Sequence, residues 1–210
     1  MSTQSYVHGA SDKQLIGQTI GRFFDDACAR HAEREALVVR HQNVRLTYAQ
    51  LDQRSDRLAH VLAAAGVGPG DHVALRMRNG HQYLEAMLAA FKLRAVPVNV
   101  NTRYTTAELA YLLADAEPSF VIHDPELGER LDAALAAVPS TAVPRRLVRG
   151  PDYEAALAAA PTGRQPIERS SDDRYLLYTG GTTGMPKGVV WRHEDLLFGA
   201  LGGGNPGGDP

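Results

Sequence analysis

Apolar positions along this chain recur with two alternating spacings. Short apolar runs, typical of buried strands, lie at residues 72–77, 96–100, 119–123 and 175–178, with a weaker run at 146–148. Between them, apolar residues three and four positions apart predict helices at residues 83–93, 106–116, 125–137 and 153–159. Strands and helices that alternate in this way are typical of a mostly parallel sheet with helices on both faces, so the pattern predicts an α/β fold.

The first seventy residues follow a different order. In sequence, the pattern predicts a helix at 19–30, a hairpin of residues 36–40 and 44–46, and a second helix that ends at Gly66. Thr47 precedes the second helix and is a good N-cap, because its hydroxyl can accept a hydrogen bond from the first turn. We expect this helix–hairpin–helix unit, residues 19–71, to belong to a second, incomplete subdomain.

The remaining divisions of the chain follow from composition. Residues 72–198 are expected to form the α/β subdomain, and the polar residues 1–18 a flexible N-terminus. Residues 199–210 contain six glycines and two prolines. Such a segment has too few apolar side chains to pack a core, so it predicts a flexible tail.

The overall composition is that of an ordinary soluble globular protein. Apolar residues make up 44% of the 210 residues, charged residues 22%, and the net charge is −2. This charge gives no electrostatic reason to expect a nucleic-acid partner, and no apolar stretch reaches the roughly 18 residues of a membrane span. The single cysteine, Cys28, permits no intrachain disulfide and is expected to be a buried small apolar residue. We therefore expect a cytoplasmic protein.

The segment with the most chemical information is residues 178–191, Tyr-Thr-Gly-Gly-Thr-Thr-Gly-Met-Pro-Lys-Gly-Val-Val-Trp. It follows a predicted strand and holds four glycines, three threonines and one lysine within residues 179–188. Glycines allow the backbone to take positive φ and to approach a ligand, and successive N–H groups in such a turn can bind an anion. Lys187 adds a flexible positive charge, one of only three lysines among 22 basic residues. The composition suits a polyphosphate.

The spacing of this segment excludes the common P-loop motif. That motif requires glycine, four residues, and then Gly-Lys-Ser/Thr, whereas Pro186 precedes Lys187 and Gly188 follows it. No hydroxyl residue stands after the lysine to hold magnesium. The structural alternative is a glycine- and threonine-rich turn between two strands.

Residues 178–188 resemble the phosphate-loop signature of the adenylate-forming (AMP-binding) superfamily. Its pattern is roughly Thr-Ser/Gly-Gly-Ser/Thr-Thr-Gly-x-Pro-Lys-Gly, and Gly180 occupies the position where serine is commonest. Residues 46–51 and 91–109 also resemble family segments, so the likeness runs from about residue 20 to residue 200. The form Gly-Gly-Thr-Thr followed by Val-Val-Trp is most similar to bacterial fatty-acyl-CoA synthetases.

The resemblance implies a fold, a reaction and a set of binding residues. It implies the N-terminal portion of the acyl-CoA synthetase large domain, with ATP, Mg²⁺ and coenzyme A as cofactors of the full-length enzyme. A carboxylic acid, expected to be a fatty acid, would form an acyl-adenylate and then a CoA thioester. The residues it implies as phosphate-binding are Thr179, Gly180, Gly181, Thr182, Thr183, Gly184 and Lys187. Of these, Lys187 and Thr182 would be catalytic because they stabilise charge on the leaving pyrophosphate.

The chain departs from the family pattern in length. Family members are usually more than twice as long, and the phosphate loop normally falls in their first half. The segments that would supply a magnesium-binding glutamate, a ribose-binding aspartate and a C-terminal catalytic lysine are absent from these residues. We therefore expect the N-terminal part of such an enzyme, inactive alone. The alternative is a non-catalytic truncated homologue or nucleotide-binding partner protein with the same fold, and a homodimer stays open.

Other residues give weaker indications. The eight histidines show no metal-ligand spacing, so no metal site is expected. His193 is predicted to be a capping or surface residue, and Trp191 to lie in the core or in a pocket wall. Asp172 and Asp173 stand just before a predicted strand and are expected to form a solvated turn. Arg103 is expected to be a structural hydrogen-bond donor.

Overall fold

A computed structural model describes residues 17–138, 144–179 and 184–200. The helices are α1 (Ile20–His31), α2 (Tyr48–Ala64), α3 (His81–Lys92), α4 (Thr106–Ala116), α5 (Gly128–Ala136), α6 (Pro151–Ala159) and α7 (His193–Gly199), with 3₁₀ turns η1 (Arg40–Gln42) and η2 (Pro125–Leu127). The strands are β1 (Glu35–Val39), β2 (Val44–Thr47), β3 (His72–Arg76), β4 (Val96–Asn99), β5 (Phe120–His123), β6 (Arg145–Val148), β7 (Arg174–Thr179) and β8 (Lys187–Arg192).

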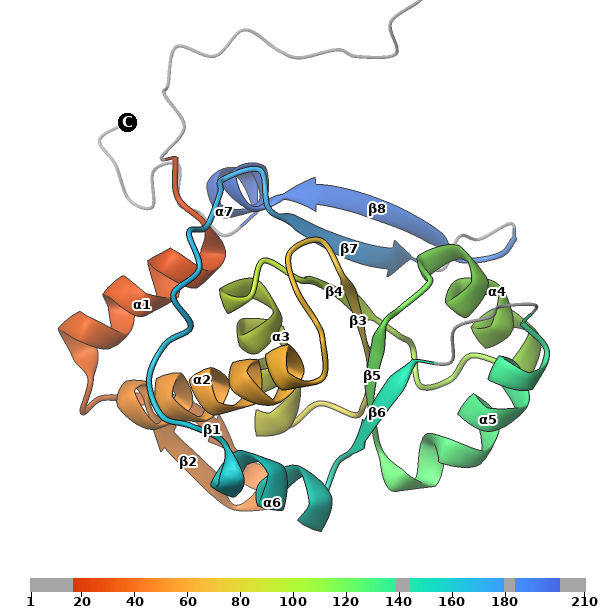
Figure 1. The fold of residues 1–210 in the computed structure, drawn as a ribbon, viewed down its shortest axis with the longest axis horizontal. Coiled ribbons are helices and arrows are strands. Elements are labelled where there is room, and N and C mark those ends of the chain that lie inside the picture. The colour runs from red at the N-terminus through yellow and green to blue at the C-terminus, as the bar shows by residue number, and fades with distance from the viewer. Residues whose placement is uncertain (1–16, 139–143, 180–183, 201–210) are drawn as a thin grey trace, which may run out of the picture.

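Six of these strands form one twisted sheet in the order β6-β5-β3-β4-β7-β8 (Figure 1). The first five are parallel to their neighbours, and only β8 runs antiparallel, as the second strand of a hairpin with β7. Strands β1 and β2 form a separate antiparallel pair. The prediction of a mostly parallel α/β sheet is confirmed, and its strand and helix positions agree to within a few residues.

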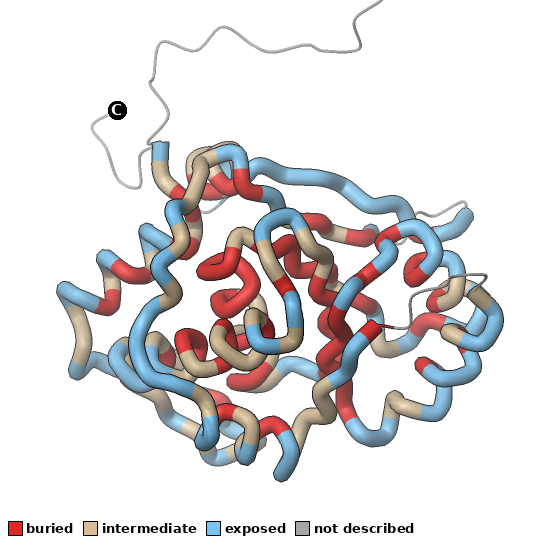
Figure 2. The backbone as a smooth tube through the Cα atoms, in the orientation of Figure 1, coloured by how far each residue is buried: buried red, intermediate tan, exposed pale blue. Residues whose placement is uncertain are grey.

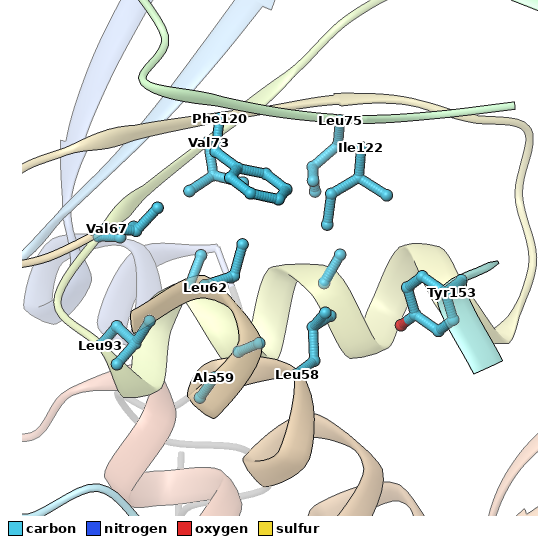
Figure 3. Close-up of a cluster of buried hydrophobic side chains, with 14 of the residues drawn as sticks. Leu58, Ala59, Leu62, Val67, Val73, Leu75, Leu93, Phe120, Ile122 and Tyr153 are labelled. Carbon is cyan, nitrogen blue, oxygen red and sulfur yellow. The ribbon is translucent and has the colours of Figure 1, made fainter. Parts of the chain in front are cut away.

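Both faces of the sheet are covered, because successive residues of a strand point to opposite sides. On one face, Val73 and Leu75 of β3 pack with residues of α2, α3 and α6 (Figure 3). On the other, Ala74 of the same strand packs with residues of α4 and α5. The buried residues therefore run through the centre of the molecule, with exposed positions on the outer sides of the helices (Figure 2). A strand that is buried on both faces has a continuous run of apolar residues. For this reason the central strands could be predicted from the sequence.

The N-terminal unit packs directly against this core. Leu58, Ala59 and Leu62 of α2 lie in the same buried cluster as the β3 side chains (Figure 3). Thr47 begins α2 as predicted: its hydroxyl accepts from the N–H of Gln50 and the Gln50 side chain accepts from the Thr47 N–H. The division at residue 71 stays a prediction, and within the described residues α2 and α3 form one continuous layer.

A buried lysine joins these two helices. Lys92, at the end of α3, is 2% exposed. Its Nζ lies 2.7 Å from Asp52 Oδ1, 2.6 Å from Asp56 Oδ1 and 2.8 Å from Ser55 Oγ, all on α2. Burial raises the pKa of the Asp56 carboxyl although the ammonium lies beside it. The lysine thus pairs with the buried carboxylate of Asp56 and adds to the contacts that Asp52 and Ser55 make with other groups.

Removal of this ammonium should strongly destabilise the fold. We expect Lys92→Met to lower the free energy of unfolding by about 3–5 kcal/mol, because it leaves the buried carboxylate of Asp56 without the ammonium that pairs with it. Urea denaturation followed by circular dichroism measures the change.

The matched control is Arg45→Met. Arg45 Nη1 lies at the same 2.7 Å from Glu35 Oε1, but both side chains are more than half exposed. We expect it to lower stability by less than about 1 kcal/mol. Equal losses for the two variants would contradict the assignment of a burial-dependent role to Lys92.

Candidate functional site

A cleft of about 690 Å³ lies at the carboxyl ends of β3, β4 and β7. Helix α3, which follows β3, and helix α4, which follows β4, cover opposite faces of the sheet (Figure 1), so the strand ends between them are left open. Many of the lining side chains are polar or aromatic: Asn79, Asn99, Asn101, Tyr83, Tyr104 and Tyr178. Ligands of open parallel sheets bind at such a place.

Two arginines add positive charge to the cleft lining, Arg78 and Arg103. The role predicted for Arg103 was structural donation, but in the turn it is the backbone N–H that donates to Asn101 Oδ1 (2.9 Å). The Arg103 side chain is exposed and makes no hydrogen bond to another described residue. It is therefore accessible to a ligand.

The wall of the cleft is supported by a buried arginine that sequence reasoning missed. Arg76 is fully buried, and its Nη1 donates to the carbonyl of Leu127, a lining residue (2.7 Å). Its Nε and Nη2 have no partner among the described residues. Burial, and then the nearby Arg130, lower the pKa of Arg76. A single charged residue at the end of an apolar strand gave no sequence signal for this contact.

The predicted phosphate loop begins and ends in the β7–β8 hairpin, at one edge of the sheet (Figure 1). Thr179 and Lys187 pair across the two strands, as do Tyr178 and Gly188. Directly paired residues have Cβ atoms about 4.5–5.5 Å apart, so the two ends of the loop lie side by side. Both Thr179 and Lys187 are exposed. Because Tyr178 lines the cleft, the two described ends of the loop, Thr179 and Lys187, lie next to a residue of the cleft.

Only part of the predicted phosphate-binding set falls within the described structure. Thr179, Gly184 and Lys187 are described, and the hairpin brings the first and last of them together. Gly180, Gly181, Thr182 and Thr183 lie outside the described residues. Their roles stay predictions.

Gly188 is required for packing. A Cβ at this position would lie 3.0 Å from Leu176 Cδ1 and 3.1 Å from Tyr178 Cζ. Gly184, by contrast, has nothing within 4 Å of a Cβ position. Neither residue has positive φ. Positive φ therefore does not explain the glycine at either described loop position, and at Gly188 close approach of the Tyr178 ring does.

His193 corrects a sequence prediction. It is fully buried, and its ring meets Phe91 edge to face with centroids 4.6 Å apart. Its two ring nitrogens have no partner among the described residues. Burial lowers the pKa of His193 to about 4, against an opposing effect of Asp173. The prediction of a surface or capping residue was wrong, because Phe91 from α3 provides an apolar contact that local sequence does not reveal.

Two neighbouring predictions are corrected in the same region. Asp173 does not lie in a solvated turn: it is buried, and its Oδ1 accepts from Arg94 Nε at 2.8 Å. Asp172 is exposed, as predicted, and pairs with Arg192. Trp191 is 36% exposed on the edge strand β8 and lies neither in the core nor in a described pocket wall. All six residues of β8 are exposed, so no described element covers the apolar side chains of this strand.

The prediction for Cys28 is confirmed. Its thiol is buried and its Sγ lies 3.5 Å from the carbonyl oxygen of Tyr48. Burial, and then Asp52, raise the pKa of Cys28 to about 12. A thiol with so high a pKa is a poor nucleophile at neutral pH.

Two kinds of feature are absent from the described residues. No group of three or more histidine, cysteine, aspartate or glutamate side chains could hold a metal ion there. None of the described helices is long and apolar enough to cross a membrane.

The sequence matches known proteins over most of its length. The family model described as AMP-binding enzyme matches residues 24–206. The 3-oxocholest-4-en-26-oate–CoA ligase of Rhodococcus rhodochrous is 44% identical over 182 residues, covering 82% of this chain and 32% of that protein. The medium-chain acyl-CoA ligase Mig of Mycobacterium avium is 39% identical over 183 residues, covering 77% and 33%. The chain spans about a third of the length of these relatives.

The fold also matches solved structures. The inhibitor-bound N-terminal domain of FACL13 from Mycobacterium tuberculosis superposes with a TM-score of 0.78 and 32% identity. The match covers 85% of this chain and 45% of that one. The sheet described above is thus similar to the sheet of an N-terminal domain in an independently solved protein.

The two described loop glycines should differ in their tolerance of a methyl group. We expect Gly188→Ala to destabilise the protein by about 1–3 kcal/mol, because Leu176 and the Tyr178 ring must shift. Gly184→Ala, in open space, should change stability by less than about 0.5 kcal/mol. Thermal unfolding measures both, and a Gly188→Ala variant as stable as Gly184→Ala would refute the close-approach role.

His193 should make stability depend on pH. Its folded pKa of about 4 lies below the unfolded value near 6.5, so the unfolded chain binds the proton first as the pH falls. We expect this contribution to be complete above about pH 6.5 and to be lost progressively toward pH 4, by up to about 3 kcal/mol.

The substitution His193→Phe keeps an aromatic ring against Phe91 and cannot be protonated. Urea midpoints at pH 7.5, 6 and 5 should therefore vary less in this variant than in wild type. The same change at the exposed His41 serves as the control. If His193→Phe retains the full wild-type slope, another group is responsible.

Proposed function

We propose, from the premise that this chain belongs to the AMP-binding enzyme family, that it is the N-terminal part of an ATP-dependent acyl-CoA synthetase. In the proposed reaction, the carboxylate oxygen of the acid attacks the α-phosphorus of ATP, and pyrophosphate leaves. The thiol of coenzyme A then displaces AMP from the acyl-adenylate to give the thioester. The names of the two curated relatives, both CoA ligases, support this reaction.

The observation that carries the proposal is the pairing of Thr179 with Lys187 at the mouth of the hairpin. The pairing gathers a hydroxyl and an ammonium at one exposed point beside the cleft. A hydroxyl can donate a hydrogen bond, and a flexible ammonium can follow a phosphate group that moves. These two groups fit the β- and γ-phosphates of ATP.

Lys187 is proposed to act on the leaving group. Negative charge grows on the pyrophosphate as its bond to the α-phosphorus breaks, so the positive charge of Lys187 binds the transition state more tightly than the ground state. Thr182 is proposed as a second donor to the same oxygens, with the backbone of Gly180, Gly181, Thr183 and Gly184 around them. No residue of the chain needs to act as a nucleophile.

The described residues fit some of the proposed cofactors better than others. The hydroxyl of Thr179 and the ammonium of Lys187 are proposed to bind the phosphates of ATP. For Mg²⁺ the described residues offer no carboxylate cluster, so we assign no metal ligand in this chain. Coenzyme A is proposed as the second substrate of the full-length enzyme, without an assigned site here. The buried, lone Cys28 supports a cytoplasmic setting for the reaction.

The acid substrate is proposed to carry a large apolar group. One curated relative is named for medium-chain acyl groups and the other for a sterol-derived acid. Both names describe a carboxylate on an extended apolar body. We therefore propose a fatty or similarly hydrophobic carboxylic acid.

Replacement of Lys187 should slow the first half-reaction. In the full native protein, we expect Lys187→Ala to reduce kcat for acyl-adenylate formation, measured by pyrophosphate exchange, by about 10²–10³-fold. The effect should fall mainly on kcat and less on the KM for ATP, because the contact strengthens toward the transition state. Lys187→Arg should restore only part of the rate, since a guanidinium is larger and planar.

The second half-reaction is the internal control. Thioester formation from supplied acyl-adenylate involves no pyrophosphate, so Lys187→Ala should leave it nearly unchanged. A wild-type rate of pyrophosphate exchange in Lys187→Ala would contradict the phosphate role. Absence of exchange in the wild-type protein would instead favour the alternative of a non-catalytic homologue with the same fold.

A further inference from the structure

Tyr178 is held from three sides at the root of the phosphate-loop hairpin. Its N–H donates to Asn99 Oδ1 of β4 (3.0 Å), and its hydroxyl donates to Asp115 Oδ2 of α4. Its ring packs against the bare backbone of Gly188 in β8. The residue is 5% exposed. A sheet neighbour, a helix and the partner strand of the hairpin thus meet at one side chain.

The hairpin joins the neighbouring strand β4 through a short junction. Strands β4 and β7 are matched at one ladder pair, Val98 with Leu176. The Asn99 side chain extends this junction by accepting from the Tyr178 N–H. Tyr178 pairs with Gly188 across the hairpin. The next pair toward the loop is Thr179 with Lys187. A shift of Tyr178 would therefore move both groups assigned to phosphate.

Asp115 has an unusual place for a carboxylate. It lies in the last turn of α4, where the helix dipole disfavours negative charge, and it is exposed. Among the described residues, its side-chain hydrogen bond is the one from Tyr178. Burial, and then the hydrogen bond to Asp115, raise the pKa of Tyr178, so the phenol stays protonated and donates throughout the physiological range. The position does not favour the helix, and the contact that the carboxylate makes is the one with Tyr178.

We propose that Tyr178 and Asp115 are positioning residues for the phosphate loop. Their hydrogen bond fixes the β7–β8 hairpin to α4 and so sets the place of Thr179 and Lys187 at the rim of the cleft. The inference rests on the proposed function, because it assigns the pair a role in holding the loop for ATP. Neither residue touches the reacting atoms in this account.

The chain supplies a matched comparison for a purely structural role. Tyr153 of α6 is also buried, and its hydroxyl donates to a carboxylate, Glu85 Oε2, at 2.7 Å. It lies in the cluster on the opposite face of the sheet from Tyr178 (Figure 3). Tyr153→Phe and Tyr178→Phe remove the same hydroxyl from a buried ring, although the acceptor Glu85 is itself buried and Asp115 is exposed. Only the second removes it beside the loop.

The test measures ATP binding and catalysis in four variants of the full native protein: Tyr178→Phe, Asp115→Ala, their combination, and Tyr153→Phe. Within residues 1–210 the single tryptophan, Trp191, lies in β8 and reports on the hairpin by its fluorescence as Mg-ATP is added. If other tryptophans follow in the native chain, they are replaced first. Pyrophosphate exchange gives kcat and KM, and thermal unfolding gives stability.

We expect Tyr178→Phe and Asp115→Ala each to reduce kcat of pyrophosphate exchange on the order of tenfold, the size of one hydrogen bond to a charged group. The double variant should be no slower than either single one, because both remove the same contact. Asp115→Asn, which keeps an acceptor oxygen, should restore part of the rate. Tyr153→Phe should lower the melting temperature and leave kcat within about twofold.

Three results would overturn the inference. They are wild-type kcat in both single variants, additive losses in the double variant, or an equal loss of kcat in Tyr153→Phe. Failure of the proposed function looks different: the wild-type protein would then show no ATP response, or Lys187→Ala would exchange pyrophosphate at the wild-type rate. A variant that does not fold is identified by thermal unfolding, and Asp115→Asn then carries the same comparison.

Discussion

The burial of β3 on both faces is the constraint on which the rest of the molecule depends. Val73 and Leu75 face one helical layer and Ala74 the other, so no polar chemistry can lie along the middle of the strand. Polar groups are left to the strand ends, where parallel strands bring their carboxyl termini together. The cleft, the hairpin mouth and the exposed arginines all lie at that edge. The candidate site lies at the carboxyl ends of the strands, beyond the two apolar layers that cover the sheet.

Charged side chains hold the helices of one layer to each other. Lys92 joins α3 to α2, and Arg54 of α2 reaches Glu85 of α3 at 2.6 Å and Glu154 of α6 at 2.9 Å. Burial alone would make each of these ions unfavourable, so each is paired and hydrogen-bonded. Arg76 departs from this rule, because one of its nitrogens has a partner and two have none among the described residues.

The β7–β8 hairpin has an exposed outer strand and a base that is fixed by tertiary contacts. Its outer strand is exposed throughout, including the apolar Val189 and Val190, and it runs against the direction of the other strands. At its base, Tyr178 makes hydrogen bonds to Asn99 of β4 and Asp115 of α4. Its ring packs against Gly188, where a larger residue would not fit. A phosphate loop needs its ends fixed so that its donors are already in place when charge develops. Gly188, a residue of the phosphate-loop signature, is therefore also needed for the packing of the Tyr178 ring.

The sequence by itself determined the class of fold and the identity of the candidate loop. The spacing of apolar residues and helix caps such as Thr47 involve only residues within about four positions of each other. For this reason the strands and helices could be predicted from the sequence alone. The contacts of His193 with Phe91, of Lys92 with Asp56, and of Tyr178 with Asp115 join residues far apart in sequence. No local pattern encodes such partners, because burial of a polar side chain depends on what the completed fold places against it. Tertiary structure alone therefore decided that His193 is buried and Trp191 exposed, and that Lys187 lies beside Thr179.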